Sequence, residues 1–321
     1  MTQPSRSRIA VLDDWQSVAS GVVDWTVLEA IGEVSFLHEY PADTATMVKR
    51  LESFNVICVM RERTIFNEDL LSQLPNLKLI VTGGMRNAAL DLNAAKRLGI
   101  QVCGTESYKH AAPEVTWALI MGITRNLVSE VNSVRQGGWQ VGLGSDLHGK
   151  TLGILGLGAI GQWIARYGLA FGMKVIAWSE NLTAERAAES GVTYVSKQEL
   201  FEQSDILSVH LVLSDRSRGL VDAQALAWMK PTAYLINTAR GPIIDEVALI
   251  DTLRQRKIAG AALDVFDIEP LPAEHPFRDL DNVLPTPHIG YVTENNYRTF
   301  YGLMIEDIQA WHAGTPIRVI A

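Results

Sequence analysis

The sequence has little cysteine, no long apolar run and no excess of positive charge. Its only two cysteines, Cys58 and Cys103, lie far apart in apolar stretches and form no CxxC spacing. A disulfide framework and a zinc knuckle are therefore not expected, and both residues are predicted to be small buried thiols. No apolar run approaches the length of a membrane span, and the run before Asp13 is too short for a signal peptide. We therefore expect a protein of the reducing cytoplasm.

The charge balance is acidic, with 28 lysines and arginines against 36 aspartates and glutamates, a formal net charge of −8. An acidic surface repels phosphate backbones and anionic lipids, so neither nucleic acid nor a membrane is an expected partner. A small anionic substrate stays possible, because it responds to local charge. The 321 residues show no repeat and no long linker, and 47% are hydrophobic. This is a globular composition, and the length favours two domains.

Short apolar runs alternate with stretches of helical spacing. Strands are predicted first at RIAVLD, VICVM, KLIVTGG and IQVCG, and then at TLGILGL, KVIAW, AYLIN and IAGAALDVF. Alternation of strand and helix indicates an α/β protein with a parallel sheet covered on both faces. One unit is expected at residues 1–103 and another at 104–291. The helical pattern at 293–314 could belong to either unit.

One long helix is predicted to begin near Pro113 and to end at Gly137-Gly138. Proline suits a first helical turn, and Glu114 suits the positive end of the helix. The apolar residues recur at helical spacing over the whole stretch, at Val115, Leu119, Ile123, Leu127, Val131 and Val134. The pattern shows no break, so we expect one continuous helix.

Two glycine-rich patterns compete as phosphate sites. Residues 144–151 match the GxxxxGK[ST] pattern of ATP-binding loops, but a strand follows them where a helix is required, so a surface turn is favoured. The GxGxxG pattern at 156–161 has the required strand before it and a helix opening inside it. Its glycines would allow a tight turn, close approach of a pyrophosphate, and close helix packing. The predicted dinucleotide-binding residues here are Gly156, Gly158, Ala159, Ile160 and Gly161.

The choice between NAD and NADP depends on the end of the next strand. Ser179 and Glu180 follow Trp178, and an acid at this edge would bind the adenosine ribose hydroxyls. Glu180 stands one residue away from the usual position of that acid. No arginine follows immediately to hold a 2′-phosphate, and Arg186 is otherwise an ordinary solvated helix charge. NAD is the predicted cofactor and NADP the alternative.

Longer motifs carry a family resemblance, namely LPNLKLIVTGGMRNAALDL, GKTLGILGLGAIG, INTARGPIIDEVAL, AALDVFDIEPLP and PTPHIGYVT. Over most of its length the chain resembles the D-isomer-specific 2-hydroxyacid dehydrogenases, which include glyoxylate and hydroxypyruvate reductases, phosphoglycerate dehydrogenases and D-lactate dehydrogenases. The resemblance implies two doubly wound parallel-sheet domains. A Rossmann cofactor domain at 104–291 is inserted in a flavodoxin-like substrate domain of residues 1–103 and 292–321. It also implies an active site between the domains, a homodimer formed through the cofactor domain, and a small 2-oxo or 2-hydroxy acid as substrate.

Three residues match the catalytic positions of that family. Arg240 matches the arginine that holds the substrate carboxylate, Glu269 the acid paired with the histidine, and His288 the general acid and base. Reduction of a 2-oxo acid needs a hydride on carbon and a proton on oxygen, and a histidine can exchange that proton near neutral pH. A neighbouring carboxylate favours the imidazolium and orients the ring. A guanidinium matches a carboxylate with two parallel hydrogen bonds.

Further positions follow from the resemblance with less force. Asp264 matches the acid that accepts the nicotinamide carboxamide, and His210 lies on the nicotinamide side or has a structural role. The backbone at Met85 and Arg86 matches the loop that holds the substrate carboxylate. Many family members have glycine where this sequence has Arg86, which leaves the loop shape and substrate size open. Arg61 either faces the cleft or is a solvated charge at a strand end. No metal site is expected, and a solvated role is favoured for the remaining histidines, His38, His110, His148, His275 and His312.

Other functions compatible with the fold stay open. A non-catalytic dinucleotide-sensing protein is the main alternative, since transcriptional corepressors resemble the same family. Oxidation of formate is a related chemistry, but it moves no proton and so needs no glutamate beside the histidine. Glu269 therefore counts against it. A triphosphatase is the least favoured alternative, because the ATP-loop pattern lies in the wrong context.

Overall fold

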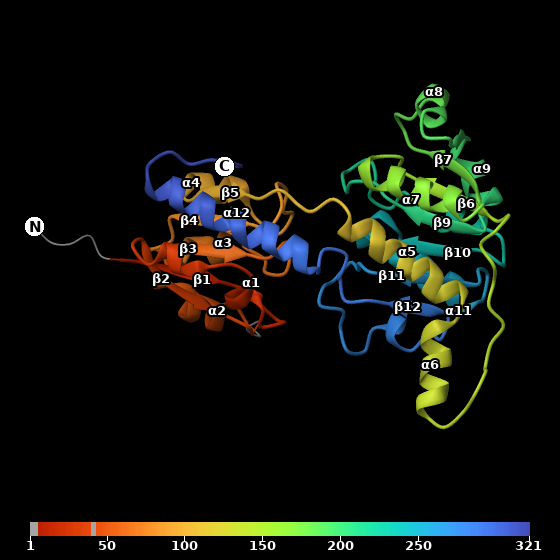
Figure 1. Cartoon of the computed structure of the whole chain (residues 1–321), viewed down its shortest axis with the longest axis horizontal. Helices are drawn as coiled ribbons and strands as arrows, with labels where there is room; N and C mark the ends of the chain where they lie inside the picture. Colours follow the sequence, from red (N-terminus) through yellow and green to blue (C-terminus); the bar gives the residue numbers. More distant parts are fainter. Residues whose placement is uncertain (1–5, 40–42) are drawn as a thin grey trace, which may run out of the picture. The chain divides into compact units, whose positions relative to one another are not determined.

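The computed structural model describes residues 6–39 and 43–321, and the chain forms two compact units (Figure 1). The first unit comprises Met1–Tyr108 and Val292–Ala321, and the second comprises Lys109–Tyr291. Each unit contains one parallel sheet, of five and seven strands respectively, covered by helices. The prediction of two doubly wound α/β units is therefore confirmed. Within the described ranges, no helix has both the length and the apolar character needed to cross a bilayer.

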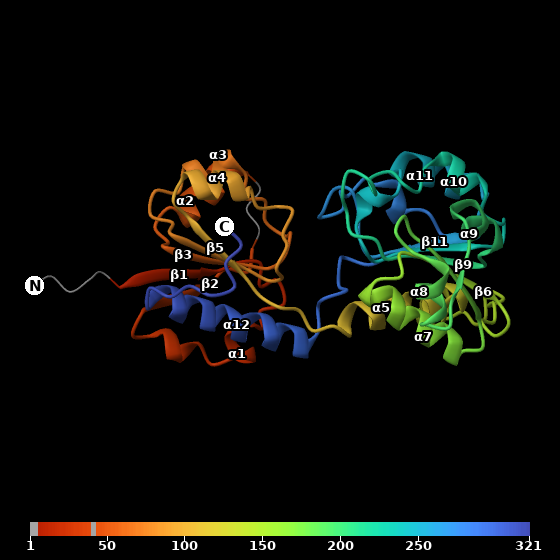
Figure 2. The same ribbon diagram turned by 90° about the horizontal axis from the view of Figure 1, so that it is seen from above.

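The sheet of the first unit has the order β2-β1-β3-β4-β5. Its strands are β1 (Ser7–Val11), β2 (Gly32–Phe36), β3 (Val56–Val59), β4 (Leu79–Thr82) and β5 (Gln101–Gly104). One face carries α2 (Thr44–Leu51), α3 (Glu68–Ser72) and α4 (Leu92–Arg97), and the other carries α1 (Ala19–Val22) and α12 (Glu294–His312) (Figure 2). β3 and β4 are buried throughout, as expected for strands covered on both faces. The strand order reverses between β1 and β3, and ligands bind at such points beyond the carboxyl ends of the strands.

The C-terminal helix α12 packs within the first unit. Thr293 caps its start, and its apolar side chains, including Tyr297, Phe300, Tyr301, Met304 and Ile308, are buried. The chain after the helix then runs along β5, where Cys103 pairs antiparallel with Val319 and the N–H of Val102 donates to the Ala321 carbonyl at 2.7 Å. The two ends of the sequence therefore build one unit together.

The sheet of the second unit has the order β12-β11-β10-β9-β6-β7-β8. The strands are β6 (Thr151–Leu155), β7 (Lys174–Trp178), β8 (Thr193–Tyr194), β9 (Ile206–Val209), β10 (Tyr234–Asn237), β11 (Gly260–Leu263) and β12 (Val283–Pro285). On one face, α5 (Ala111–Thr124), α7 (Ala159–Ala170) and α8 (Ala184–Ala188) share one apolar core. On the other face, α9 (Lys197–Gln203), α10 (Ala223–Ala227) and α11 (Glu246–Arg254) share a second core (Figure 2).

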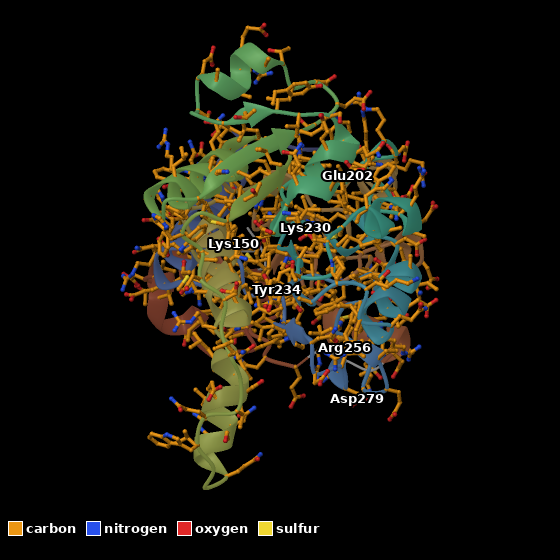
Figure 3. All side chains as sticks on the ribbon, turned by 90° about the vertical axis from the view of Figure 1, so that its right-hand side faces the viewer. Lys150, Glu202, Lys230, Tyr234, Arg256 and Asp279 are labelled. Atoms are coloured by element: carbon orange, nitrogen blue, oxygen red, sulfur yellow. The ribbon has the colours of Figure 1, made fainter. Side chains whose placement is uncertain are left out.

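The prediction of one long helix over residues 113–136 is wrong. α5 ends at Thr124 and a separate helix, α6 (Leu127–Arg135), begins after Asn126. Asn126 adopts a left-handed backbone with φ of 51°, which cannot continue a right-handed helix. α6 projects away from the rest of its unit (Figures 1 and 3). Its apolar residues therefore stay exposed, with Leu127 at 50% and Val134 at 55%, although their spacing continued the stripe of α5.

At the amino-terminal edge of the second sheet, polar side chains bond to one another and to the backbone. Lys150, Lys230 and Tyr234 lie in the middle of this face (Figure 3). Asp205 accepts hydrogen bonds from the Thr151 N–H at 2.8 Å and from Lys230 Nζ at 2.9 Å. The chain before β6 forms a turn and then a strand with no helix, so residues 144–151 lack the context of an ATP-binding loop, as predicted. Cys58 and Cys103 are buried free thiols, which confirms that prediction also.

Candidate active site

The glycine turn between β6 and α7 has the geometry that a dinucleotide requires. Gly156 has φ of +104°, and a Cβ there would lie 2.9 Å from the His210 carbonyl oxygen. A Cβ on Gly161 would lie 2.2 Å from the Gly156 carbonyl oxygen, so the helix approaches the turn closely. Gly158, the N-cap residue of α7, is exposed and faces open space, and no side chain caps the helix. The first-turn N–H groups at Ala159 and Ile160 thus suit a pyrophosphate.

The end of β7 lies directly beside this turn. Leu155 pairs with Trp178, and the Gly156 N–H donates to the Trp178 carbonyl at 2.9 Å. The strand ends at Trp178, and Ser179 then begins a turn in which its carbonyl accepts from the Leu182 N–H. Glu180 is exposed in that turn. The residues predicted to contact the adenosine ribose therefore stand beside the glycine turn.

Glu269 and His288 form a close pair at the carboxyl end of the sheet. Glu269 Oε2 lies 2.6 Å from His288 Nδ1, and Glu269 Oε1 accepts a hydrogen bond from the Phe266 N–H at 2.9 Å. Because Nδ1 faces a carboxylate, that nitrogen carries a proton, and Nε2 is the ring atom left for proton exchange. The Tyr291 ring packs edge-on to the imidazole, with centroids 5.3 Å apart.

Asp264 holds the segment that presents His288. Its Oδ1 accepts from Thr286 Oγ1 at 2.6 Å and from the Ile289 N–H at 2.9 Å, and its Oδ2 accepts from the Gly290 N–H at 2.8 Å. Burial raises the pKa of Asp264, although these hydrogen bonds and the charge of His288 oppose the rise. His288 has φ of 51°, a costly conformation for a residue with a Cβ. Hydrogen bonds on both sides of His288 therefore stabilise its unusual backbone.

Arg240 follows β10 and adjoins the segment that carries Glu269. Asn237 at the strand end is buried, accepts from the Ala239 N–H at 3.0 Å and donates to the Arg240 carbonyl at 3.0 Å, which shapes the turn. A Cβ on the next residue, Gly241, would lie 2.1 Å from the Phe266 carbonyl carbon. The Arg240 turn and the Glu269 segment thus touch through backbone atoms, an approach that only glycine permits.

His210 follows β9 next to the glycine turn. Its Nε2 lies 2.8 Å from Ser208 Oγ. Removal from water lowers the pKa of His210 to about 3, so the ring is neutral in the physiological range. A neutral ring at this edge suits a position near an uncharged part of a ligand and makes His210 unsuitable as an acid at neutral pH.

Three of the four predicted substrate residues, Arg61, Met85 and Arg86, lie in the first unit, at the carboxyl ends of β3 and β4. Arg61 follows β3 with φ of 56° and donates to the Gly83 carbonyl at 3.3 Å. Its guanidinium covers Gly84, where a Cβ would lie 1.9 Å from Nη1. Met85 and Arg86 come next and are both exposed. Arg61 therefore lies against the loop that the resemblance assigned to the substrate carboxylate, and its side chain is only 16% exposed.

Two supporting residues in the second unit escaped the sequence analysis. Asn237 shapes the Arg240 turn, and Thr286 binds Asp264 beside His288. A signal exists for the first, because an asparagine ends the otherwise apolar strand YLIN. Thr286 gives no such signal, since its partner lies 22 residues away in sequence.

Comparison with known proteins identifies the family of the chain. Residues 117–290 match the family described as "D-isomer specific 2-hydroxyacid dehydrogenase, NAD binding domain". The chain is 41% identical over 256 residues to a glyoxylate reductase of Aeropyrum pernix, covering 77% of this chain and 76% of the relative. It is 34% identical to a D-3-phosphoglycerate dehydrogenase of Bacillus subtilis over 90% of its own length, but it spans only 55% of that relative.

A solved structure is similar over nearly the whole chain. The crystal structure of a phosphoglycerate oxidoreductase from Vibrio cholerae O395 superposes with a TM-score of 0.92 at 36% identity, covering 96% of this chain and 99% of that one. With this match and the family match over residues 117–290, the chain belongs to the D-isomer-specific 2-hydroxyacid dehydrogenase family.

Proposed function

We propose that this protein is a nicotinamide-dependent oxidoreductase that interconverts a small 2-oxo acid and the corresponding D-2-hydroxy acid. The observation that carries the proposal is the 2.6 Å contact between Glu269 Oε2 and His288 Nδ1. In this pair, Nε2 of His288 is available for proton exchange with substrate, and the Glu269 carboxylate orients the ring through Nδ1. A protein that only senses a dinucleotide has no need for such a pair.

His288 gives a proton to the carbonyl oxygen during reduction and takes it back during oxidation. Glu269 fixes the ring through Nδ1 and stabilises the imidazolium, while its second oxygen stays on the Phe266 N–H. The nicotinamide cofactor, when bound, supplies or accepts the hydride at the substrate carbon. The proton and the hydride therefore arrive from different groups, which is the requirement of 2-oxo acid reduction.

Arg240 binds the substrate carboxylate in this proposal. Its planar guanidinium offers two parallel N–H donors, and its turn is fixed by Asn237. In the first unit, the loop at Met85 and Arg86 is assigned to substrate binding through its backbone N–H groups, and Arg61 supports that loop through Gly83. The similarity to a glyoxylate reductase supports a small 2-oxo acid as the substrate.

We assign the cofactor to residues 104–291 and the substrate-binding loops to residues 1–103 with 292–321. The turn at Gly156, Gly158 and Gly161 holds the pyrophosphate, and Glu180 binds the ribose hydroxyls and selects NAD over NADP. Asp264 and His210 lie toward the nicotinamide end. The reaction belongs to the reducing cytoplasm, as the two buried thiols suggest.

We also propose that a second copy of the chain covers α6. The helix and the segment after it expose a run of apolar side chains, namely Leu127, Val128, Val131, Val134, Trp139, Val141 and Leu143. Trp139 is 74% exposed and Leu143 is 97% exposed, and contiguous apolar surface of this kind marks an interaction site. α6 projects from its unit, so two copies related by a twofold axis can each receive the other's helix (Figure 1).

Sedimentation tests the homodimer. Val131→Glu should convert a dimer into a monomer, whereas Val27→Glu, at an exposed valine of the first unit, should leave the dimer intact. A wild-type monomer at micromolar concentration would contradict the proposed dimer.

The activity itself is tested with a panel of 2-oxo acids, each offered with NADH and with NADPH. We expect consumption of NADH with glyoxylate or hydroxypyruvate and formation of the D-hydroxy acid. Binding of NADH without turnover of any panel member would favour the dinucleotide-sensing alternative. Turnover of formate in place of the 2-oxo acids would contradict the role given to Glu269.

A further inference from the structure

A second glutamate–histidine pair lies beside the segment that carries Glu269. Glu246 is the first residue of α11, and its Oε1 lies 3.1 Å from Nε2 of His275. The two side chains are only 22% and 13% exposed. The expectation that His275 is solvated is therefore wrong, because the ring is partly enclosed between Glu246 and Phe277, whose ring centroid lies 4.9 Å away.

The hydrogen bonds of His275 define the direction of this pair. His275 Nδ1 accepts from the Phe277 N–H at 3.3 Å, so the proton lies on Nε2, which donates to Glu246. The other oxygen of Glu246 accepts from the Asp267 N–H at 3.4 Å. The Glu246 carboxylate thus bonds to both ends of the segment 267–275, at Asp267 and at His275, and Glu269 lies between these two residues in sequence.

The segment has further contacts at Leu271, which packs against the apolar core, and at Pro272, whose carbonyl accepts from the His275 N–H at 3.1 Å. Residues 267–270 are exposed, and the guanidinium of Arg278 donates to the carbonyls of Leu271 and Pro272 at 2.6 and 2.8 Å. Glu246 also shares the wall of one small cavity with Asn237, Gly241 and Phe277. Glu246 therefore links the Glu269 segment to the turn that presents Arg240.

Capping of α11 does not explain Glu246. Asp245 is the N-cap residue and accepts from the Ala248 N–H at 3.0 Å, so the helix start already has its side-chain partner. The charged groups that face Asp267 at this place are Glu246, Arg218, Asp245 and His275. Burial raises the pKa of Asp267, and the charges of Glu246 and Asp245 act in the same direction. The carboxylate of Glu246 therefore bonds to the Asp267 N–H and to His275 Nε2, and the start of α11 is capped by Asp245 instead.

We propose that Glu246 and His275 are positioning residues, which hold the segment 267–275 so that Glu269 meets His288 in the geometry required for proton transfer. This inference rests on the proposed function. The physical reason is that an exposed loop samples many conformations, and holding it in one of them costs conformational entropy. A displacement of about 1 Å at a reacting group can lower a rate by roughly 10²-fold.

The test uses Glu246→Ala and His275→Leu, with Glu246→Gln as a milder variant that keeps the size of the side chain. We expect a fall in kcat/KM for 2-oxo acid reduction of about tenfold or more, with an unchanged Kd for NADH. We also expect the alkaline limb of the pH profile to move to lower pH, because Glu269 no longer stabilises the imidazolium. Hydrogen exchange of the amides in 266–275 should become faster. His275→Gln keeps an N–H donor and an acceptor and should restore most of the activity.

Glu199→Ala is the matched control. Glu199 lies in the first turn of α9, and it closes a capping box with Ser196 in the same unit. Its loss should lower the Tm and leave the pH profile and the exchange of 266–275 unchanged. If Glu246→Ala and Glu246→Gln behave like this control, the positioning role is wrong. If the wild-type protein reduces no 2-oxo acid, the proposed function fails, but the exchange measurement still decides whether Glu246 orders the segment.

Discussion

The two edges of the sheet in the second unit contain similar pairs and differ in what the pairs leave available. At the amino-terminal edge, Asp205 Oδ1 lies 2.9 Å from Lys230 Nζ. At the carboxyl edge, Glu269 Oε2 lies 2.6 Å from His288 Nδ1. Each pair joins a carboxylate to a nitrogen that can carry a proton, and in each the second carboxylate oxygen accepts a backbone N–H.

The difference lies in the nitrogen partner. Lys230 also donates to the Gln203 carbonyl, and an ammonium group has no acceptor, so this pair only holds two segments together. His288 has a second ring nitrogen beyond the one that faces Glu269, and an imidazole nitrogen can either donate or accept a proton. An ion pair can therefore take part in proton transfer only when one partner has a second nitrogen that can exchange a proton with a ligand.

Substitution of His288 should have the largest effect. We expect His288→Ala to lower kcat by roughly 10²–10⁴, the usual scale for loss of general acid–base catalysis, and to leave NADH binding nearly unchanged. Steady-state kinetics and a fluorescence titration of NADH measure the two quantities. Turnover close to that of the wild type would end the assignment of His288 and with it the contrast between the two edges.

Arg240→Lys should have the next largest effect. Lysine keeps the positive charge but loses the planar fork that matches a carboxylate. Loss of a charge-assisted hydrogen bond of about 1.5–3 kcal/mol corresponds to a fall in kcat/KM of roughly 10–100-fold for 2-oxo acids. The Kd for NADH should change little. Equal activity of the two enzymes would show that Arg240 supports the turn at Asn237 and does not clamp substrate.

Glu180→Ala tests the cofactor edge. β7 ends at Trp178, so the chain turns at Ser179 and Glu180 can face the ribose. Removal of the carboxylate removes two acceptors and the repulsion of a 2′-phosphate. The ratio of kcat/KM for NADPH to that for NADH should rise by about tenfold, or about 1.4 kcal/mol. A wild-type preference for NADPH would contradict the role of Glu180 and favour Ser179 with Arg186.

Asp205→Asn should have the smallest effect, and on stability alone. Burial raises the pKa of Asp205, but hydrogen bonds from Thr151 and Lys230 and the charges of Lys230 and Lys150 lower it. The pKa of Asp205 therefore lies below its usual value of 3.8. Its contribution is therefore present above pH 3.8 and lost as the pH falls through the lower folded value. Urea unfolding should show a loss of about 1–2 kcal/mol at neutral pH that shrinks below about pH 4. A fall in kcat/KM would show that the two edges are coupled.

Some parts of the fold were beyond the reach of the sequence. β2 (Gly32–Phe36) was not predicted, because it lies at a sheet edge and has one fully buried residue, so its pattern is weak. The break at Asn126 was missed because the apolar spacing continues past it into α6. That spacing predicts an apolar face, but it cannot show whether the face packs on the same unit or on another molecule.

The site divides in the same way. The glycine turn, Arg240, Glu269 and His288 were recognisable from motifs, since each motif is local and its chemistry depends on a short spacing. The bond between Glu269 and His288 spans 19 residues, and the bond between Glu246 and His275 spans 29. The motif around His288 marked it by resemblance as the reactive histidine, but nothing in the sequence around His275 pointed to Glu246 as its partner.

By itself, the sequence determined the α/β class and the dinucleotide turn, because hydrophobic periodicity and glycine spacing act over a few residues. The predicted catalytic groups followed from the resemblance of short motifs to a known family. Only the tertiary structure decided which carboxylate meets which imidazole. It also decided that Asp264 holds the left-handed backbone at His288, and that α6 leaves its unit. Those features depend on segments that the parallel sheet brings to one edge from distant positions in the chain, and hydrogen-bond geometry there is set by packing that no local pattern encodes.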